Sequence, residues 1–354
     1  MAKVYVGLSG GVDSAVSAAL LKEQGYDVTG VFIKIWSPEF LECTWREDRL
    51  DAMRVAVHLG IPFREIDLSR EYHDSVVEDM LRNYTKGITP NPDVLCNRTI
   101  KFGAFADWAF ENGADLIATG HYARIEKRDH RHVLLKGIDP SKDQSYFLYR
   151  LNEKDLSRTL FPVGGFEKKE IRKKAEHFGL PNSKRPDSQG LRLVGDVSMH
   201  EFLSRFISLE RGKLQDISGR EIGEHDGAAL YTTGQRHGFH LAADAPEGPY
   251  YVVSVDTNTN IVVVSKERAA TERERVDVID VHWIHAPVDE CDVVPRYHAP
   301  SVRAHVDSAS VTFMKPLQAT PGQSLVFYER AECLGGAIIQ PIQDQGIANR
   351  KHAV

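Results

Sequence analysis

The feature that most constrains the fold of this chain is the segment GLSGGVDS, residues 7–14, which lies between an apolar run and a helical pattern. The preceding run KVYVGL is typical of a buried strand, and AVSAALLKEQG is typical of a helix that ends at Gly25. A second apolar run, YDVTGVFIKIW, also indicates a strand. This order of strand, helix and strand predicts a βαβ unit, as in parallel sheets that are covered by helices.

The chemistry of this segment points to pyrophosphate. It has no lysine and its glycines are adjacent, so it matches neither the G-x-x-x-x-G-K-[ST] loop nor the dinucleotide G-x-G-x-x-G pattern. Gly10 and Gly11 allow close approach of the backbone to a ligand, and Ser9 and Ser14 add hydroxyl donors. The N-terminus of the following helix favours anions, and Asp13 would suit Mg²⁺ beside a phosphate. A plain tight turn is the alternative interpretation.

The alternation of strand and helix patterns continues through the first half of the chain and predicts a doubly wound, mostly parallel sheet in residues 1–205. Ligands of such sheets bind beyond the carboxyl ends of the strands. After about residue 205, short β-branched and aromatic runs alternate with Gly, Pro, Asn and Asp. These runs predict two small, mostly β domains of antiparallel barrel type, at 206–277 and 278–354.

Composition excludes several classes of protein. The 354 residues, 42% of them hydrophobic, contain no apolar run of ~18 residues and no signal-peptide pattern, so we expect a soluble cytoplasmic protein without a membrane partner. The cysteines at 43, 96, 291 and 333 form no CxxC pair, which argues against a disulfide framework or zinc finger. For Cys291 and Cys333 packing is the default role. The net charge of -6 permits only a local basic patch.

One such patch is the segment FEKKEIRKKAEHFGLPNSKRPDSQG, residues 166–190. Its seven cations are either a solvated helix face with i,i+4 pairs, such as Glu170 with Lys174, or a surface that binds phosphate. Neither of two histidine features predicts a catalytic or metal site. His121 is expected to have a hydrogen-bonded structural role, and the HRH run at 130–132 lacks a third metal ligand.

Cys96 lies in the segment TPNPDVLCNRTIKFG, residues 89–103. Pro90 and Pro92 disfavour helix at the residues before them, so Cys96 is expected near a loop-to-helix junction. Backbone amides at such a junction can stabilise a thiolate. A small buried hydrophobe is the alternative interpretation.

The glycine-serine segment resembles the signature of PP-loop ATP pyrophosphatases. Further segments resemble, in order and at compatible spacing over nearly the whole chain, the motifs of the tRNA-specific 2-thiouridylase family: TPNPDVLCNRTIKFG, ATGHYAR, KDQSYFLYRL, FPVGGFEKKEIRKKA, DSQG, YTTGQRHG and LGGAII. The resemblance implies a PP-loop domain followed by two small β domains. It also implies that ATP adenylates the C2 oxygen of the wobble uridine, at position 34 of tRNA, and that sulfur transfer then yields 2-thiouridine, AMP and pyrophosphate.

The resemblance also implies site residues, with ATP and Mg²⁺ as cofactors and with tRNA and a sulfur-donor protein or sulfide source as partners. Cys96 and Asp93 match the catalytic positions. The positions implied for ATP are Gly7, Leu8, Ser9, Gly10, Gly11, Val12, Asp13, Ser14, Ile33 and Gly120. The positions implied for tRNA are Asn91, Pro92, Asp93, Lys142, Asp143, Gln144 and Arg303, where Arg303-Ala304 is taken to replace an Arg-Tyr pair of the family.

One departure from the family pattern concerns the sulfur. Family members usually carry a second cysteine after Ser-Gln-Gly, and here the matching residue is Arg192. Three sulfur routes remain open. Cys43 could replace the second thiol, an iron–sulfur cluster held by Asp93 and Cys96 could deliver sulfide, or Cys96 could accept sulfur from a donor and act alone. Alternatively the chain binds tRNA with sulfur transfer altered or lost, or adenylates another substrate as PP-loop ligases do.

Overall fold

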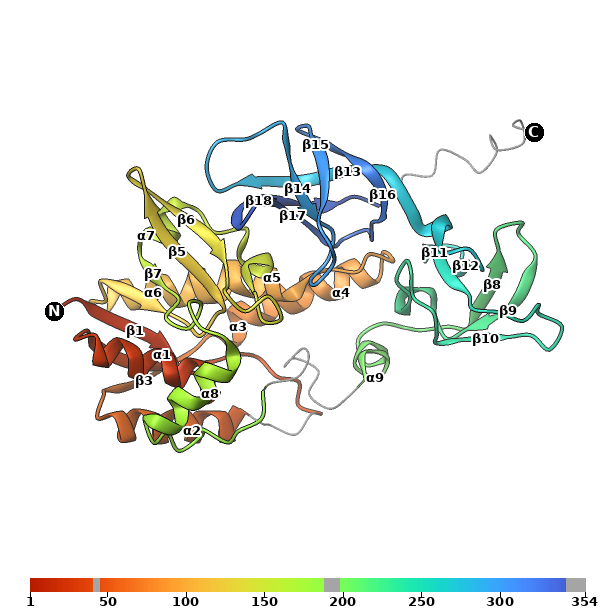
Figure 1. The fold of residues 1–354 in the computed structure, drawn as a ribbon. Helices are drawn as coiled ribbons and strands as arrows, with labels where there is room; N and C mark the ends of the chain where they lie inside the picture. The colour runs from red at the N-terminus through yellow and green to blue at the C-terminus, as the bar shows by residue number, and fades with distance from the viewer. Residues whose placement is uncertain (41–44, 188–197, 342–354) are drawn as a thin grey trace.

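The computed structural model describes residues 1–40, 45–187 and 198–341 (Figure 1). Its first part is built on a sheet of five parallel strands in the order β3-β2-β1-β4-β7. The strands are β1 (Lys3–Gly7), β2 (Asp27–Lys34), β3 (Phe63–Asp67), β4 (Leu116–Ala118) and β7 (Thr159–Leu160). The order reverses direction at β1, as in a doubly wound fold, so the predicted parallel sheet is confirmed.

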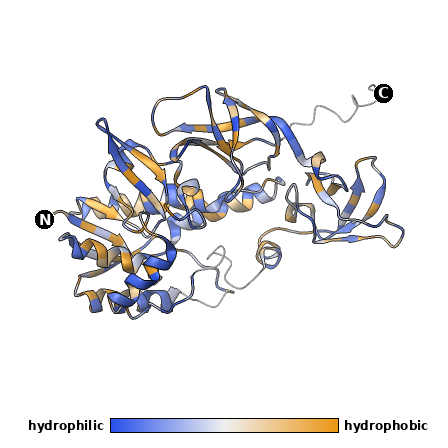
Figure 2. Ribbon diagram, viewed as in Figure 1, coloured by the Kyte–Doolittle hydropathy of each residue, from blue (hydrophilic) through white to orange (hydrophobic). Residues whose placement is uncertain are grey.

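Helices cover both faces of this sheet because its strands are apolar on both sides. Val4 and Val6 pack with α1 (Val12–Glu23), α2 (Trp45–Leu59) and α8 (Lys168–His177), whereas Tyr5, which lies between them, packs on the opposite face. Two long helical segments cover that opposite face. The first comprises α3 (Ser69–Tyr72), the π-helix η1 (His73–Val77) and α4 (Glu78–Tyr84), and the second comprises α5 (Pro92–Cys96), the π-helix η2 (Asn97–Ala104) and α6 (Phe105–Glu111). Figure 2 shows hydrophobic residues concentrated along the strands.

The central β unit is a sheet in the order β10-β9-β8-β12-β11. It comprises β8 (Gly212–Asp216), β9 (Glu221–His225), β10 (Phe239–Leu241), β11 (Tyr251–Asp256) and β12 (Ile261–Ser265). The expectation of a purely antiparallel barrel is wrong here, because β12 pairs with β8 in parallel. The β8–β9 and β11–β12 hairpins pair through β8 and β12. The connection between the hairpins lets β12 run in the same direction as β8.

The last unit is a sheet in the order β13-β16-β15-β14-β17-β18, closed into a barrel by pairing of β13 with β18. Its strands are β13 (Glu272–Trp283), β14 (Glu290–Val294), β15 (Val302–Val306), β16 (Ser310–Gln318), β17 (Ser324–Glu329) and β18 (Glu332–Ile339). Because β13 begins at Glu272, it spans the predicted boundary at 277/278. The division into 1–205, 206–277 and 278–354 remains a proposal, in which we place the start of the barrel at Glu272.

A hairpin of the first unit extends the barrel sheet, a feature that the sequence patterns did not indicate. This hairpin consists of β5 (Ala123–Arg128) and β6 (Arg131–Lys136), and β6 pairs with β18 through Leu134↔Cys333 and Leu135↔Glu332. We call this β6–β18 pairing the seam. Behind the seam, the Tyr146 hydroxyl donates to the Ser324 carbonyl at 2.8 Å, and the Ser145 and Tyr328 hydroxyls lie 3.0 Å apart. The first unit and the barrel therefore share one sheet and one core.

The shorter helical segments are α7 (Glu153–Ser157), α9 (Met199–Ser204) and the 3₁₀ turns Ser145–Leu148, Ala228–Leu230 and Arg268–Thr271. Cys291 and Cys333 are buried in the barrel, as the packing interpretation predicts, and burial raises the pKa of both thiols. None of the helices described is both long and apolar enough to cross a bilayer.

The shared seam predicts a large stability effect of Leu134→Ala. Leu134 is fully buried, so truncation removes apolar contacts and leaves a cavity, and we expect the free energy of unfolding to fall by about 2–5 kcal/mol. Leu50→Ala is the matched control, because Leu50 is 45% exposed and should change stability by less than about 0.5 kcal/mol. Urea denaturation followed by fluorescence and far-UV circular dichroism measures both, and equal effects would contradict a packed seam.

Candidate active site

The turn from β1 into α1 is a compact loop held by its own serines. Ser9 N–H donates to Ser14 Oγ at 3.2 Å, and Ser14 Oγ–H donates to the Gly11 carbonyl at 3.1 Å. Gly10 has φ +75°, in the left-handed region that favours glycine, and Gly11 precedes the first helical residue. The first turn of α1 therefore presents unpaired backbone N–H groups and a positive dipole beyond the carboxyl edge of the sheet.

Gly120 packs directly on this helix start. It follows β4, the parallel neighbour of β1, so both chain segments leave the sheet at the same edge. A Cβ atom at Gly120 would lie 2.7 Å from the Ser14 nitrogen, closer than side chains pack. The predicted ATP positions in 7–14 and Gly120 are thus brought together. Ile33 also lies nearby, with its Cδ1 3.7 Å from the position of a Gly7 Cβ.

The basic segment 166–190 converges on this loop. Lys168 Nζ lies 2.7 Å from Asp13 Oδ1 and 2.8 Å from Asp187 Oδ1, and its side chain is only 14% exposed. The Tyr122 hydroxyl donates to Asp13 at 2.8 Å. Behind the loop, Arg185 Nη1 and Asn182 Nδ2 donate to the Gly10 carbonyl at 3.3 and 2.8 Å. For Lys168 and Arg185 the solvated-helix interpretation is therefore wrong, since their charges face the loop.

The electrostatics of this cluster favour an anion. Asp187 pairs with Lys168, with Lys142 at 3.1 Å and with Arg172. Burial alone would raise the pKa of Asp187, but the bonds from Lys168 and Lys142 lower it to about 2. Asp13 and Asp187 are joined there by a third carboxylate, Asp139, which accepts from Lys168 N–H at 3.0 Å, a bond that lowers the pKa of Asp139 with further help from Lys142. The three cations lie next to the N-terminus of α1, where the helix dipole would favour phosphate groups.

Cys96 lies on a helix of the opposite face. Asn91 caps α5, with its Oδ1 accepting from Val94 N–H at 3.4 Å, and Pro92 is the first helical residue. Asp93 and Cys96, three residues apart, lie on one side of this helix. Because the helix begins at Pro92, Cys96 lies beyond its first turn, so the expected stabilisation of a thiolate by free amides is absent. Burial instead raises the pKa of Cys96, and Asp93 adds to this effect.

Lys101 is a functional candidate that the sequence reasoning missed. Its ammonium group lies 3.3 Å from His121 Nε2, and its charge lowers the pKa of both Cys96 and Asp93 against the larger effect of burial. A position five residues after Cys96 would point elsewhere in an α-helix. The wider π-helix η2 starts directly after Cys96 and turns Lys101 toward it.

His121 is a hydrogen-bonded structural residue, as expected from the sequence. It is 8% exposed, and its Nδ1 lies 2.7 Å from Thr119 Oγ1. An ammonium group can only donate, so Nε2 accepts from Lys101 and Nδ1–H donates to Thr119. Burial first, and Lys101 second, lower the pKa of His121 far below its ordinary range. The residues Thr119–His121 therefore connect the PP-loop to the helical segment α5–η2, which carries Cys96 and is called the Cys96 helix below. Gly120 contacts the PP-loop, and His121 contacts Lys101 of the Cys96 helix.

The predicted tRNA-contacting segment Lys142–Gln144 lies beside the same loop. Gln144 Oε1 accepts from Tyr122 N–H at 3.0 Å, and Asp143 Oδ1 accepts from Gly137 N–H at 2.9 Å. These side chains hold the segment in place, while Lys142 is partly exposed. Their role in tRNA binding stays a prediction.

Arg303 is placed on the barrel, where its guanidinium pairs with Glu329 at 2.9 Å. Elsewhere on the barrel, the ring of Tyr297 lies 4.5 Å from that of Phe147, close to the segment 142–144. The role of Arg303 in tRNA binding stays a prediction.

The Cys43 route depends on a residue outside the described part of the chain, and Arg192, which marks the departure from the family pattern, also lies there. The described residues can be searched for sites that would hold a single metal ion. Within residues 1–40, 45–187 and 198–341, the only group of three metal-ligating side chains close enough to share an ion is the exposed set His73, Asp74 and Glu78. Asp93 and Cys96 belong to no such group, so the described residues place no single-ion site there. The cluster route stays a prediction.

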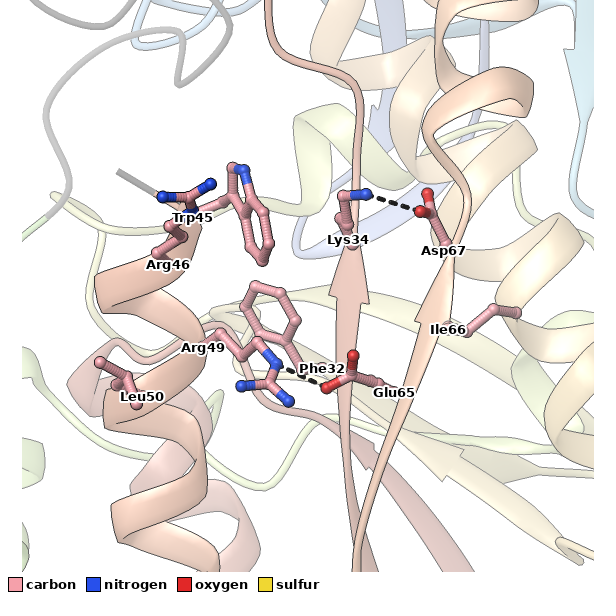
Figure 3. A pocket seen from close by; sticks show the side chains of 9 residues that line it. All are labelled: Phe32, Lys34, Trp45, Arg46, Arg49, Leu50, Glu65, Ile66 and Asp67. Carbon is pink, nitrogen blue, oxygen red and sulfur yellow. Dashed lines mark hydrogen bonds and ion pairs between the residues drawn. The ribbon is translucent and has the colours of Figure 1, made fainter. Parts of the chain in front are cut away.

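A pocket of about 450 Å³ lies between α2 and the ends of β2 and β3, across the sheet from Cys96 (Figure 3). Lys34 pairs with Asp67 at 2.7 Å and Arg49 with Glu65 at 2.6 Å, so two of its cations are already neutralised. None of the predicted site residues lines it, and we assign it no part in the chemistry.

Lys101→Met should make Cys96 less reactive toward iodoacetamide. Because the Lys101 charge lowers the pKa of Cys96, its removal raises that pKa, and less thiolate forms at any pH below it. The pH profile of alkylation, followed by mass analysis of the Cys96 peptide, should move to higher pH. Lys127→Met, at an exposed lysine on the β5–β6 hairpin, is the control and should leave the profile unchanged. An unshifted profile for Lys101→Met would show that the Lys101 charge does not act on the Cys96 thiol.

Comparison with known proteins identifies the family of this chain. Three family models match, described as the tRNA methyl transferase HUP domain (residues 2–196), the tRNA methyl transferase PRC-barrel domain (200–266) and the aminomethyltransferase beta-barrel domain (273–339). The tRNA-specific 2-thiouridylase MnmA of Streptococcus pyogenes serotype M3 is 43% identical over 97% of this chain and 96% of its own length, and that of serotype M49 is 42% identical with the same coverage.

A solved structure titled as a 4-thiouridine synthetase–RNA complex with bound ATP is more distant, at 22% identity and a TM-score of 0.37, covering 58% of this chain and 50% of its own. The assignment rests on the full-length relatives and the family models. The chain belongs to the family of tRNA-specific 2-thiouridylases.

Proposed function

We propose that this chain is an ATP-dependent tRNA 2-thiouridylase, which adenylates the C2 oxygen of the wobble uridine and replaces that oxygen with sulfur. The observation that carries the proposal is the bridge Thr119–His121, which connects a phosphate-binding loop to a helix with a thiol and a carboxyl group. Both half-reactions need such proximity, because the oxygen that receives AMP is bound to the carbon that the sulfur attacks.

The PP-loop would hold the phosphates of ATP. Backbone N–H groups of the first turn of α1 and the ammonium groups of Lys168 and Lys142 would stabilise the negative charge of the leaving pyrophosphate. Asp13 is the carboxylate at this point and the candidate to hold Mg²⁺, in place of its present bond to Lys168. Adenylation is needed because the oxygen of an amide-like carbonyl is a very poor leaving group.

Cys96 would carry the sulfur as a persulfide, which forms when the Cys96 thiolate attacks the outer sulfur of a persulfide on a donor protein and the donor's own thiolate leaves. The outer sulfur of the Cys96 persulfide attacks C2, the bond from C2 to the adenylated oxygen breaks, and AMP leaves. An external thiol then attacks Cys96 Sγ, which frees the uridine sulfur and leaves a disulfide between Cys96 and that thiol. Asp93, whose pKa burial raises despite the opposing charge of Lys101, suits proton exchange beside the base. The base would leave the anticodon stack to reach this helix.

The reaction predicts three products from wild-type protein with ATP, Mg²⁺, tRNA and a persulfide-carrying sulfur donor: 2-thiouridine, AMP and pyrophosphate. Cys96→Ser should abolish the thionucleoside, because a hydroxyl carries no persulfide. Mass analysis of digested tRNA measures it. Release of AMP and pyrophosphate without a thionucleoside from wild-type protein would support the alternatives, either adenylation of another substrate or lost sulfur transfer. Cys43→Ser, run in parallel, shows whether Cys43 replaces the second thiol.

Gly120→Ala should weaken use of ATP. The added Cβ would meet the first turn of α1, a clash that costs about 1–3 kcal/mol of folding free energy unless that turn moves. Movement of the turn displaces the backbone N–H groups that would bind phosphate, so the KM for ATP should rise. Gly165→Ala is the matched control, since a Cβ there would meet nothing within 4 Å. The KM for ATP in pyrophosphate release is the measurement. Equal KM values for both variants would contradict the placement of the phosphates between Gly120 and the PP-loop.

A further inference from the structure

The segment Ile88–Asn91, which leads into the Cys96 helix, is held by the C-terminal barrel. Thr89 N–H donates to the Pro321 carbonyl at 3.2 Å. Gln323 Nε2 donates to the carbonyls of Thr89 at 2.9 Å and of Pro90 at 3.1 Å. Pro321 and Gln323 belong to the turn between β16 and β17, more than two hundred residues further along the chain. The backbone of this segment thus bonds to the barrel in both directions, as acceptor and as donor.

The central β unit holds the same segment from a second direction. The Thr232 hydroxyl lies 2.7 Å from the Thr89 hydroxyl. A separate bond connects the two β units to each other: Gln318 Nε2 donates to the Thr233 carbonyl at 3.0 Å without touching the segment. The residues 88–91 are therefore the point at which all three parts of the chain meet. Figure 1 shows the end of α4, just before this segment, lying between the barrel and β11.

The packing at this point is too close for larger residues. Gly322 has φ +85°, and a Cβ there would lie 2.2 Å from Ile88 Cγ2 and 2.8 Å from the Thr89 carbonyl oxygen. On the other side, a Cβ at Gly87 would lie 3.2 Å from Val255 and Thr257 of the central unit. Such contacts leave the segment little room to move while the three parts are docked.

The anchored segment determines where α5 starts. Pro90 and Pro92 have fixed φ angles, so few soft dihedrals separate the two bonded carbonyls from the first turn of the helix. Asn91, between the two prolines, caps that helix. A shift at Thr89 or Pro90 would pass directly to Asp93 and Cys96, and misplacement of reacting groups by about 1 Å can cost roughly a hundredfold in rate.

We propose that Gln323 and Thr232 are positioning residues for sulfur transfer, which hold the segment 88–91 so that docking of both β units sets the place of Asp93 and Cys96. The proposal rests on the proposed function for its catalytic consequence. Neither residue needs to touch the reacting atoms, since each acts through Thr89 or Pro90. A tRNA that contacts the β units would meet a thiol whose position those same units determine.

The test uses full-length variants that remove one bond each without changing size. Gln323→Met removes the amide donor, and Thr232→Val removes the hydroxyl. Thr232→Ser retains the hydroxyl and should restore wild-type behaviour. The matched control is Gln318→Met, which removes a bond between the two β units but none to the segment 88–91. Thermal melting of every variant checks that the fold is retained.

Two measurements decide the outcome. The single-turnover rate constant of thiolation, at saturating ATP and tRNA, should fall about tenfold or more in Gln323→Met and Thr232→Val, with tRNA affinity within twofold of wild type. Amide hydrogen exchange of residues 93–101, in α5 and η2, should become faster in the same two variants and remain unchanged in Gln318→Met and Thr232→Ser.

Failure of the proposed function and failure of this inference are distinguishable. If wild-type protein forms no 2-thiouridine, the function fails, and hydrogen exchange still decides whether the two residues position the helix. If wild-type protein is active and the two variants match Gln318→Met in rate and exchange, the inference is overturned. A loss of tRNA affinity alone, with an unchanged rate constant, would also overturn it.

Discussion

The contact between Gly120 and the first turn of α1 is the constraint on which the candidate site depends. β1 and β4 are parallel neighbours, so their carboxyl ends deliver the PP-loop and the segment Thr119–His121 to the same edge of the sheet. Because Gly120 has no side chain, the two backbones approach to a distance that a Cβ would forbid. The next residue, His121, accepts a hydrogen bond from Lys101 on the helical segment that carries Cys96, and this contact fixes how far the thiol lies from the PP-loop.

Two lysines give the two halves of the site their electrostatic character. Lys168, largely buried against Asp13 and Asp187, places positive charge at the helix N-terminus where pyrophosphate would form. Lys101 opposes the burial that raises the pKa of Asp93 and Cys96. A chain with a net charge of -6 thus concentrates cations where an anionic substrate needs them. The charge of the whole chain says little about a site of this size.

The two β units contact the first unit at the segment that precedes Cys96. β18 pairs with β6 of the β5–β6 hairpin in the first unit, and the turn between β16 and β17 holds the backbone that precedes Cys96. A hydrogen-bonded sheet and a packed core resist sliding, so the barrel is a firm support for that backbone. The position of the helix that carries Cys96 is therefore set by contacts from three parts of the chain.

The sequence by itself determined the parallel sheet and the PP-loop and made Cys96 a candidate, because apolar periodicity, adjacent glycines and a thiol between motif residues are local signals. Tertiary structure alone decided the rest. Lys101 points toward Cys96 only because a π-helix widens the turn between them, and Lys168 reaches Asp13 across more than 150 residues. Gln323 and Thr232 meet Thr89 only after both β units dock. Such contacts join residues that no sequence spacing relates, so only the packing of the folded chain brings them together.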